Sequence, residues 1–180
     1  MMCELRRKLE TMTQVRDVLR HPALLAALTR ESPNTIRLVD SPHPLDRYTC
    51  LMHALDFTEK PEYTAVAERG FSVVFAGGAF AQWLLDKGLI AEASCEEAHE
   101  GNLVFYSDDE GRFKHAGLII GGRRVRSKWG MGHLVEHELL EVPESYGTRV
   151  QFFKKPSYDE AYKSFRRFAE EFGMVFEETS

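Results

Sequence analysis

Apolar residues recur at intervals of three and four along the first part of the chain, which is the spacing of amphipathic helices. Between residues 4 and 19 the series consists of Leu5, Leu9, Met12, Val15 and Leu19. A second helix is expected from His21, because Pro22 then falls in its first turn, where a proline is tolerated. The segment 31–44 holds three prolines and predicts a connecting loop. The first 43 residues therefore form a helical extension.

The apolar pattern next predicts two further helices. The first begins at Cys50 and ends near Asp56, and either Asp46 or Thr49 supplies its cap. The second covers residues 79–87 and is ended by Gly88. Cys50 is expected in the first turn of a buried helix.

Beyond residue 101 the pattern changes to strands separated by turns. Strands are predicted over 102–106, 113–120, 123–129 and 146–154, and Gly121 and Gly122 form the turn between the second and the third. A closing amphipathic helix covers 159–172. Helices, an antiparallel meander and a final helix indicate an α+β domain over residues 44–180.

Composition narrows the class of protein. The chain has 180 residues, 43% of them apolar, with 23 Lys and Arg against 28 Asp and Glu, so its formal net charge is −5. This acidity argues against general nucleic-acid binding, and no apolar run is long enough to span a bilayer. The N-terminus lacks the apolar stretch of a secretory signal. We expect a cytoplasmic protein with neither nucleic acid nor membrane as its partner.

The three cysteines cannot all pair within the chain, and their spacing matches no zinc knuckle or redox motif. A cysteine nucleophile needs a lowered pKa, an imidazole within reach and donors for the oxyanion. Cys50, at a helix start, is the candidate thiol. His115 lies in the strand 113–120, on the same face as Phe113 and opposite Ala116, and is expected to project toward the helix.

These segments resemble the sheet of NlpC-type papain-fold cysteine peptidases, which place a G-D-L-V-F strand before an H-V-G-I strand and a catalytic Cys upstream. The chain also resembles, more closely, an uncharacterised bacterial family of papain-like fold. The resemblance covers roughly residues 44–155. Its matches are residues 101–105, Tyr48 with Cys50, Ala54 and Leu55, His115 to Ile119, Ser127 to Gly130, His137, Leu139, Val142-Pro143 and Tyr146-Gly147.

The resemblance implies an α+β papain-like fold with a Cys50–His115 dyad. The sequence departs from the NlpC-type pattern at two places. Thr49 stands where NlpC-type enzymes usually have Asp, and the third catalytic residue falls near Ser127, with His137 as the alternative. Two more residues are supporting candidates. They are Tyr48 and His53, which shares a helical face with Cys50.

The predicted function is thiol-dependent acyl transfer, most often hydrolysis, with no cofactor. Cys50 would attack the carbonyl of a peptide or a small amide-containing substrate, and His115 would carry the proton. Cell-wall peptide is the substrate that the resemblance implies, and a cytoplasmic amide is equally open. The alternative from another class is a catalytically inactive binding or regulatory module of the same fold.

One further motif suggests zinc chemistry. His133, Glu136 and His137 match H-x-x-E-H, in which two His on one helix ligate zinc and the Glu polarises water. That chemistry needs a continuous helix, yet glycines precede the motif and Pro143 soon follows. The zinc-dependent hydrolase is therefore the least favoured hypothesis.

Overall fold

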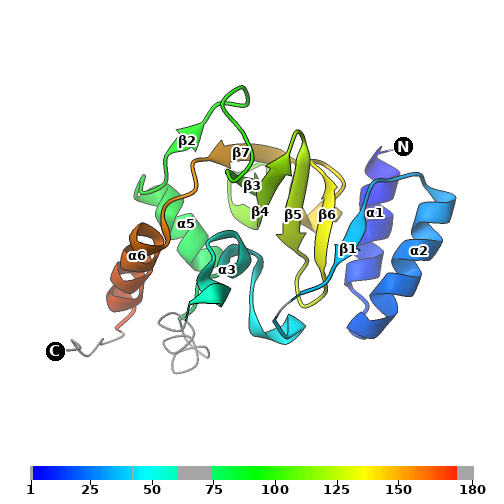
Figure 1. Cartoon of the computed structure of the whole chain (residues 1–180), viewed down its shortest axis with the longest axis horizontal. Coiled ribbons are helices and arrows are strands. Elements are labelled where there is room, and N and C mark those ends of the chain that lie inside the picture. The colour runs from blue at the N-terminus through cyan, green and yellow to red at the C-terminus, as the bar shows by residue number, and fades with distance from the viewer. Residues whose placement is uncertain (1, 42, 61–73, 174–180) are drawn as a thin grey trace.

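The computed structural model describes residues 2–41, 43–60 and 74–173 of the chain. Its strands are β1 (Arg37–Val39), β2 (Glu92–Ala93), β3 (Leu103–Ser107), β4 (Phe113–Gly121), β5 (Arg124–Lys128), β6 (Leu134–Glu138) and β7 (Arg149–Phe153). They form one seven-stranded sheet in the order β1-β6-β5-β4-β3-β7-β2, antiparallel throughout (Figure 1).

The helices of the described residues are α1 (Met2–Thr13), α2 (His21–Glu31), α3 (Cys50–Ala54), α5 (Gly78–Asp86) and α6 (Tyr158–Glu171). Single 3₁₀ turns lie at Val18–Arg20, Leu45–Arg47, Phe57–Glu59 and Glu144–Tyr146. Helices, an antiparallel sheet and a closing helix thus follow one another along the chain. The predicted α+β class is confirmed.

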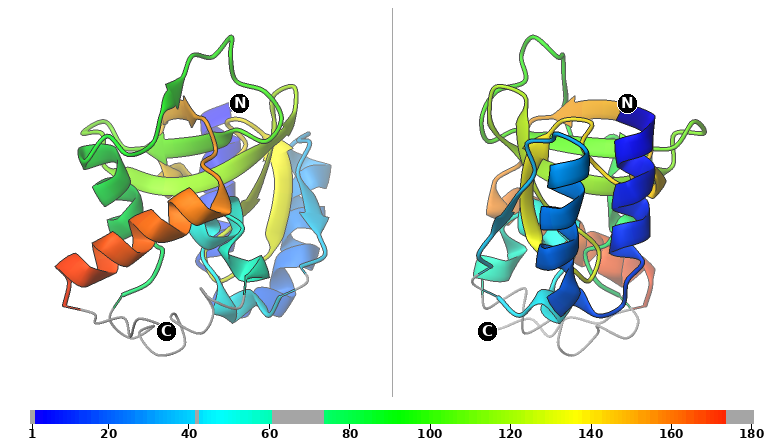
Figure 2. Two further views of the ribbon diagram at one scale, coloured as in Figure 1. Left: turned by 60° about the vertical axis from the view of Figure 1, so that its left-hand side comes forward. Right: turned by 90° about the vertical axis from the view of Figure 1, so that its right-hand side faces the viewer.

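Helices cover both faces of the sheet, so the molecule has three layers (Figures 1 and 2). We call the first face the α3 face. Its sheet residues pack in one core with α3, α5 and α6, and they are Leu103, Phe105, Ala116 and Phe153. The opposite one is the α1 face, whose sheet residues pack with α1 and α2 and include Val104, Tyr106, Val125 and Val135. Because strand side chains alternate, neighbouring residues of β3 serve different cores.

Local signals explain where several helices begin. Thr49 caps α3: its Oγ1 accepts a hydrogen bond from the Met52 N–H at 3.1 Å. Ser157 and Glu160 form a capping box at the start of α6. Gly88, in the left-handed region at φ +60°, follows α5. The predictions of all three helices are confirmed to within two residues, with Thr49 rather than Asp46 as the cap.

The first predicted helix is too long, because α1 ends at Thr13 and not near residue 19. The Asp17 carboxylate accepts a hydrogen bond from the Leu19 N–H at 3.2 Å and caps a separate 3₁₀ turn. Leu19 is 82% exposed, although its spacing fits the apolar series. A side-chain acceptor offered the backbone an alternative to helical hydrogen bonding.

Three strands are absent from the sequence prediction, namely β1, β2 and β6. β1 lies in the expected connecting loop and pairs with β6, so the N-terminal extension is not purely helical and supplies an edge strand. β6 in turn pairs with β5. All three are short, and distant strands pair with β1 and β2, so the local apolar pattern gives no sufficient signal for them.

Candidate functional site

A bulge at the start of β4 decides which way His115 points. Tyr106 of β3 pairs with His115, whereas Ser107 pairs with Phe113, so Lys114 is an extra residue in the ladder. Phe113 contacts Phe105 on the α3 face, with ring centroids 5.0 Å apart. The extra residue places His115 on the opposite face. The expectation that Phe113 and His115 share a face is wrong.

The His115 side chain is held between aromatic rings on the α1 face. Its ring stacks on Tyr146 at 4.0 Å and lies 5.7 Å from the ring of Tyr106. It is 2% exposed, and its Nε2 atom has no hydrogen-bond partner. Burial, with smaller contributions from His137 and Lys128, lowers the pKa of His115 well below its ordinary value. His115 is a neutral core residue in this arrangement.

Cys50 lies on the other side of the sheet, at the first position of α3. Thr49 fixes this helix start, since its hydroxyl also donates to the Ala76 carbonyl at 2.7 Å. Cys50 is partly exposed as a whole residue, and it packs against the α3-face core. Burial raises the pKa of Cys50, and hydrogen bonds from the backbone N–H groups of Ala116, Leu51 and Cys50 itself partly oppose this.

The predicted dyad is therefore not assembled. Ala116, the residue whose backbone meets the thiol, belongs to the same core as Cys50, and His115 beside it in β4 faces the other core. In the described part of the chain no hydrogen bond joins Cys50 to His115. The thiol has a different titratable neighbour.

That neighbour is Lys128, at the end of β5. Leu118 pairs with Arg126. Because the strands are antiparallel, two residues later in β5 and two residues earlier in β4, Lys128 comes opposite Ala116. The Lys128 side chain is fully buried: its ammonium donates to the Gly130 carbonyl at 2.6 Å and lies 5.0 Å from the centre of the Tyr48 ring. This combination gives the amine one acceptor and one π-face in place of water.

Burial lowers the pKa of Lys128 to about 8, although the Coulomb attraction of Cys50 and Asp46 opposes the shift. The same attraction works on the thiol, since the charge on Lys128 lowers the pKa of Cys50. The two groups are thus electrostatically coupled. A lysine whose pKa is near neutrality can exist as a free amine and accept a proton.

Sequence reasoning missed Lys128. By its alternation alone, the basic run 123–128 indicates the solvated face of a strand with Val125 opposite. The alternation itself is confirmed, because Val125 is buried on the α1 face while Arg126 pairs with Glu136 across the other face. Lys128 continues the arginine side of the strand, and α3 covers it there. The sequence signal for this position is that Lys128 falls two residues after Arg126 and four after Arg124, on the same face of the strand.

Tyr48 and His53 both lie near this site, in different roles. The Tyr48 hydroxyl shares a 2.6 Å hydrogen bond with Ser41 Oγ, which fixes the ring under Lys128. His53 lies 6.4 Å from the Tyr48 ring, and its buried Nε2 has no partner. Burial, then the charge of Arg126, lowers the pKa of His53 to about 4. Tyr48 is a supporting residue, and His53 packs as a neutral ring.

Ser127 and His137 orient each other, not His115. Trp129 Nε1 donates to Ser127 Oγ at 3.1 Å, and Ser127 Oγ lies 2.9 Å from His137 Nε2. The other ring nitrogen of His137 lies 2.8 Å from the Glu138 carbonyl. Burial lowers the pKa of His137 to about 4. Both residues are fully buried on the α1 face, in a hydrogen-bonded chain that stabilises the sheet.

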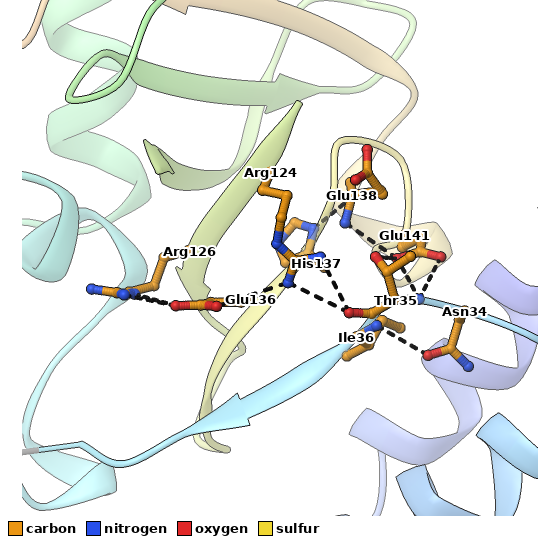
Figure 3. Close-up of polar contacts among 9 residues, drawn as sticks. All are labelled: Asn34, Thr35, Ile36, Arg124, Arg126, Glu136, His137, Glu138 and Glu141. Atoms are coloured by element: carbon orange, nitrogen blue, oxygen red, sulfur yellow. Dashed lines mark hydrogen bonds and ion pairs between the residues drawn. The ribbon is translucent and has the colours of Figure 1, made fainter. Parts of the chain in front are cut away.

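The zinc motif does not form its helix, because residues 134–138 are strand β6. Glu136 lies on the α3 face, where it contacts Arg126 at 2.6 Å and Arg124 at 3.8 Å (Figure 3). His137 points to the opposite face, and His133 binds the Val18 carbonyl. Among the residues that the structure describes, no three His, Cys, Asp or Glu side chains are placed to hold a metal ion. The helix that the least favoured, zinc hypothesis requires is therefore not formed.

The polar network in Figure 3 anchors the edge strand β1 to the end of β6. Glu141 accepts hydrogen bonds from the backbone N–H and hydroxyl of Thr35 and from the Glu138 N–H, and the Arg124 guanidinium donates to the Thr35 carbonyl. These contacts tie the segment before β1 to the end of β6.

A cavity of about 520 Å³ lies near the site, between the N-terminal extension and the turn after β5. Asp46, Met131 and Gly132 line it from the site side, and Val15 and Val18 line it from the extension. Asp46 is the carboxylate that acts on Lys128. The cavity is therefore linked to Lys128 through Asp46, although neither Cys50 nor Lys128 lines it.

None of the helices described is long and apolar enough to cross a membrane. In comparisons with known proteins, a family model described as a domain of unknown function, DUF7689, matches residues 41–154. No curated protein matches the chain, and no solved structure does. The match contains Cys50 and Lys128 and ends at the last strand of the sheet.

Proposed function

Because this chain belongs to the DUF7689 family, whose description assigns no activity, we propose its function from the chemistry of its site. It is a thiol-dependent acyl hydrolase in which Cys50 is the nucleophile and Lys128, in place of His115, accepts the proton. The observation that carries this proposal is the buried Lys128, whose pKa falls to about 8 and which is coupled to the thiol.

The arrangement supports a papain-like fold of the NlpC type at the level of its parts. A cysteine begins a helix, and that helix packs on an antiparallel sheet. The sequence motifs of the family resemblance converge near this helix: Lys128 of the S-K-W-G segment lies over Tyr48. In this proposal the base is displaced by one strand, from β4 to β5.

The proposed reaction has two halves. The Lys128 amine takes the thiol proton, and the Cys50 sulfur attacks the acyl carbon while its carbonyl electrons move to oxygen. The Cys50 backbone N–H stabilises that oxyanion. The oxyanion collapses, the bond to the leaving group breaks, and the Lys128 ammonium protonates that group. Water then attacks the thioester with Lys128 as base, which releases the acid and restores the thiol.

The substrate class follows from the surroundings. Cys50 is partly exposed as a residue, and the cavity that Asp46 and Arg16 line also has the apolar side chains Val15, Val18 and Met131. An apolar side chain of a peptide or of a small amide fits such a cavity, and its polar backbone would meet the charged residues. The substrate is thus a peptide or an amide-containing small molecule.

A second candidate function is a binding module that has lost the chemistry. Two observations favour it: burial raises the pKa of Cys50, and His115 faces away. The two candidates differ in what they expect of the thiol. A hydrolase acylates Cys50 and turns over, whereas a binding module leaves it no more reactive than an ordinary cysteine.

The decisive experiment uses the variant Cys3→Ala/Cys95→Ala, which removes the two exposed thiols. We expect p-nitrophenyl acetate to give a transient acetyl adduct on Cys50 by intact-mass analysis, and steady-state release of nitrophenol. Adding Cys50→Ala should abolish both, and adding Lys128→Met should slow the acylation about tenfold or more.

The matched control is His115→Phe in the same background, which should acylate at the parent rate because its side chain faces the other core. Acylation no faster than that of a free cysteine peptide at the same pH would exclude the hydrolase and leave the binding module. Loss of activity in the His115 variant with the fold retained would restore the original dyad and exclude the role of Lys128.

A further inference from the structure

A second cavity, of about 450 Å³, lies away from Cys50, between the end of α5, the end of β7 and the first half of α6. Its wall on α6 consists of residues at intervals of three and four, which share one helical face. They are Glu160, Lys163, Ser164 and Arg167. The opposite wall is made by residues 89–91 and by Lys154 and Lys155 (Figure 1 shows α5, β7 and α6 around it).

Four cationic side chains line this cavity in a protein whose net charge is −5. Lys155 is ion-paired with Asp56 at 2.5 Å. In the described ranges, no carboxylate lies within ion-pair distance of Lys154, Lys163 or Arg167. All three are exposed to solvent. Glu97, a carboxylate on which Lys154 acts electrostatically, does not line the cavity.

The one carboxylate in the wall already has donors. Glu160 accepts hydrogen bonds from the Ser157 N–H at 2.9 Å and from the Ser157 hydroxyl at 2.7 Å. With Glu160 and Asp56 offsetting two of the four cations, the cavity retains two positive charges. A dianion therefore matches it better than a monoanion does.

The base of the cavity is apolar. Leu84, Ile90 and Ala161 are buried beneath it, and Leu89 is 38% exposed at its rim. Arg167 is braced on one side, since its guanidinium lies 6.0 Å from the Trp83 ring. The backbone of Lys154 is fixed by a 2.9 Å hydrogen bond from its N–H to the Ala91 carbonyl. Both cations thus rest on ordered elements.

We propose that this cavity, which we call the α6 cavity, binds a phosphomonoester dianion whose organic part is apolar. Lys154, Lys163 and Arg167 contact the phosphate, with Ser164 as a further donor, and the organic part lies against Leu89 and Ile90. Arg167 offers the planar fork that pairs with two phosphate oxygens, and the lysines act as point charges. This inference is independent of the proposed hydrolase.

The test is a titration of the whole chain with phenyl phosphate at low salt, in which backbone amide chemical shifts measure the binding. We expect saturable shifts in residues 89–91 and 160–167. Arg167→Gln and Lys163→Gln should each weaken the binding about tenfold, because each removes a charged partner of the phosphate. Arg7→Gln, an exposed cation on α1, should change it less than about twofold.

Three probes complete the experiment. Benzyl alcohol, which lacks the phosphate, should not bind, and inorganic phosphate should bind more weakly than phenyl phosphate. Cys50→Ala should bind phenyl phosphate as the parent does. Equal binding of benzyl alcohol, equal loss in Arg7→Gln, or no saturable shift at these residues would each overturn the proposal, whatever the outcome at Cys50.

Discussion

The two faces of the sheet bury their titratable groups in different ways. On the α3 face the Lys128 amine has a carbonyl acceptor, an aromatic ring and a thiol as neighbours. On the α1 face His115 and His137 lie among aromatic side chains. Lys128 has a pKa of about 8 and exchanges its proton near neutral pH, while burial keeps both imidazoles neutral. The comparison shows that position within the sheet, more than residue type, decides which group can serve as a base.

A single extra residue produces this difference. Without Lys114 in the bulge, the alternation from Phe113 would direct His115 toward α3. With it, Ala116 faces the thiol, and the next strand supplies Lys128, a titratable side chain whose charge acts on the thiol. A shift of one residue exchanges the two faces, and the candidate base changes from a histidine to a lysine.

The largest expected effect concerns Lys128. Its folded pKa is about 8 and its unfolded value about 10.4, so between these values the unfolded chain holds more protons and wild-type stability gains from a rise in pH. Lys128→Met lacks this gain. Urea unfolding at pH 7 and pH 10.5 should show the variant losing on the order of 3 kcal/mol relative to wild type across that interval.

The matched control is Lys163→Met, an exposed lysine on α6, for which the difference from wild type should stay constant with pH. A constant difference for Lys128→Met as well would contradict the buried, shifted amine on the α3 face.

The next effect compares how tightly the two faces pack around a glycine. A Cβ at Gly117, on the α1 face, would lie 2.5 Å from Val125 Cγ1 and 3.1 Å from the Arg126 carbonyl oxygen. Gly117→Ala should therefore cost about 2 kcal/mol of unfolding free energy. The measurement is chemical denaturation at neutral pH.

Gly78, at the start of α5, is the contrasting case, because its Cβ would meet only Phe113 at 3.7 Å. Gly78→Ala should be neutral or stabilise the fold by up to about 1 kcal/mol. If Gly117→Ala is tolerated as well as Gly78→Ala, the close packing around β4 and β5 is wrong.

The α1 face should be sensitive to acid. Because burial lowers the folded pKa of His115, the unfolded chain binds more protons below pH 6.5, and stability falls as the pH falls. His115→Phe keeps a ring against Tyr146 and removes this proton linkage. Unfolding free energies from pH 6.5 downward should diverge in favour of the variant by on the order of 1 kcal/mol per pH unit.

His99→Gln serves as the control, since His99 is exposed and should leave the acid limb unchanged. Parallel curves for wild type and His115→Phe would show that His115 titrates in the native state, and would place it in a solvated or charge-paired position.

The smallest effect concerns Glu136, the carboxylate of the H-x-x-E-H motif. Its partners Arg124 and Arg126 are partly exposed, so Glu136→Gln should cost less than about 1 kcal/mol. Metal analysis should give the same result for the variant and wild type. A large loss of stability together with a loss of bound zinc would revive the metal hypothesis.

Long periodic segments were predictable from the sequence. Apolar spacing and capping residues predict strands β3, β4, β5 and β7. They also predict the helices at residues 79–87 and 159–172 and the helix start at Cys50. The same signals distinguish Cys50 from the other two cysteines, because only Cys50 is predicted at the start of a buried helix. The match between periodicity and structure is closest where a segment buries one continuous face.

Three features are not predictable from local sequence patterns, because each depends on contacts with another part of the fold: the β4 bulge, strand β1 and the burial of Lys128. Lys114 in the bulge is compatible with the alternation, and its displacement shows only in the pairing with β3. β1 exists because β6 provides its hydrogen bonds. Lys128 resembles a solvated residue until α3 and the Tyr48 ring cover it. In the last two cases the partner lies far away in the sequence.

The most direct test of the central claim is the rate of iodoacetamide labelling of Cys50 against pH in the Cys3→Ala/Cys95→Ala background. Since the Lys128 charge lowers the pKa of the thiol, adding Lys128→Met should raise that pKa and slow labelling at pH 7.5 about tenfold, while His115→Phe leaves the profile unchanged. An unchanged profile in the Lys128 variant, or an equal shift in the His115 variant, would contradict the pairing of Cys50 with Lys128.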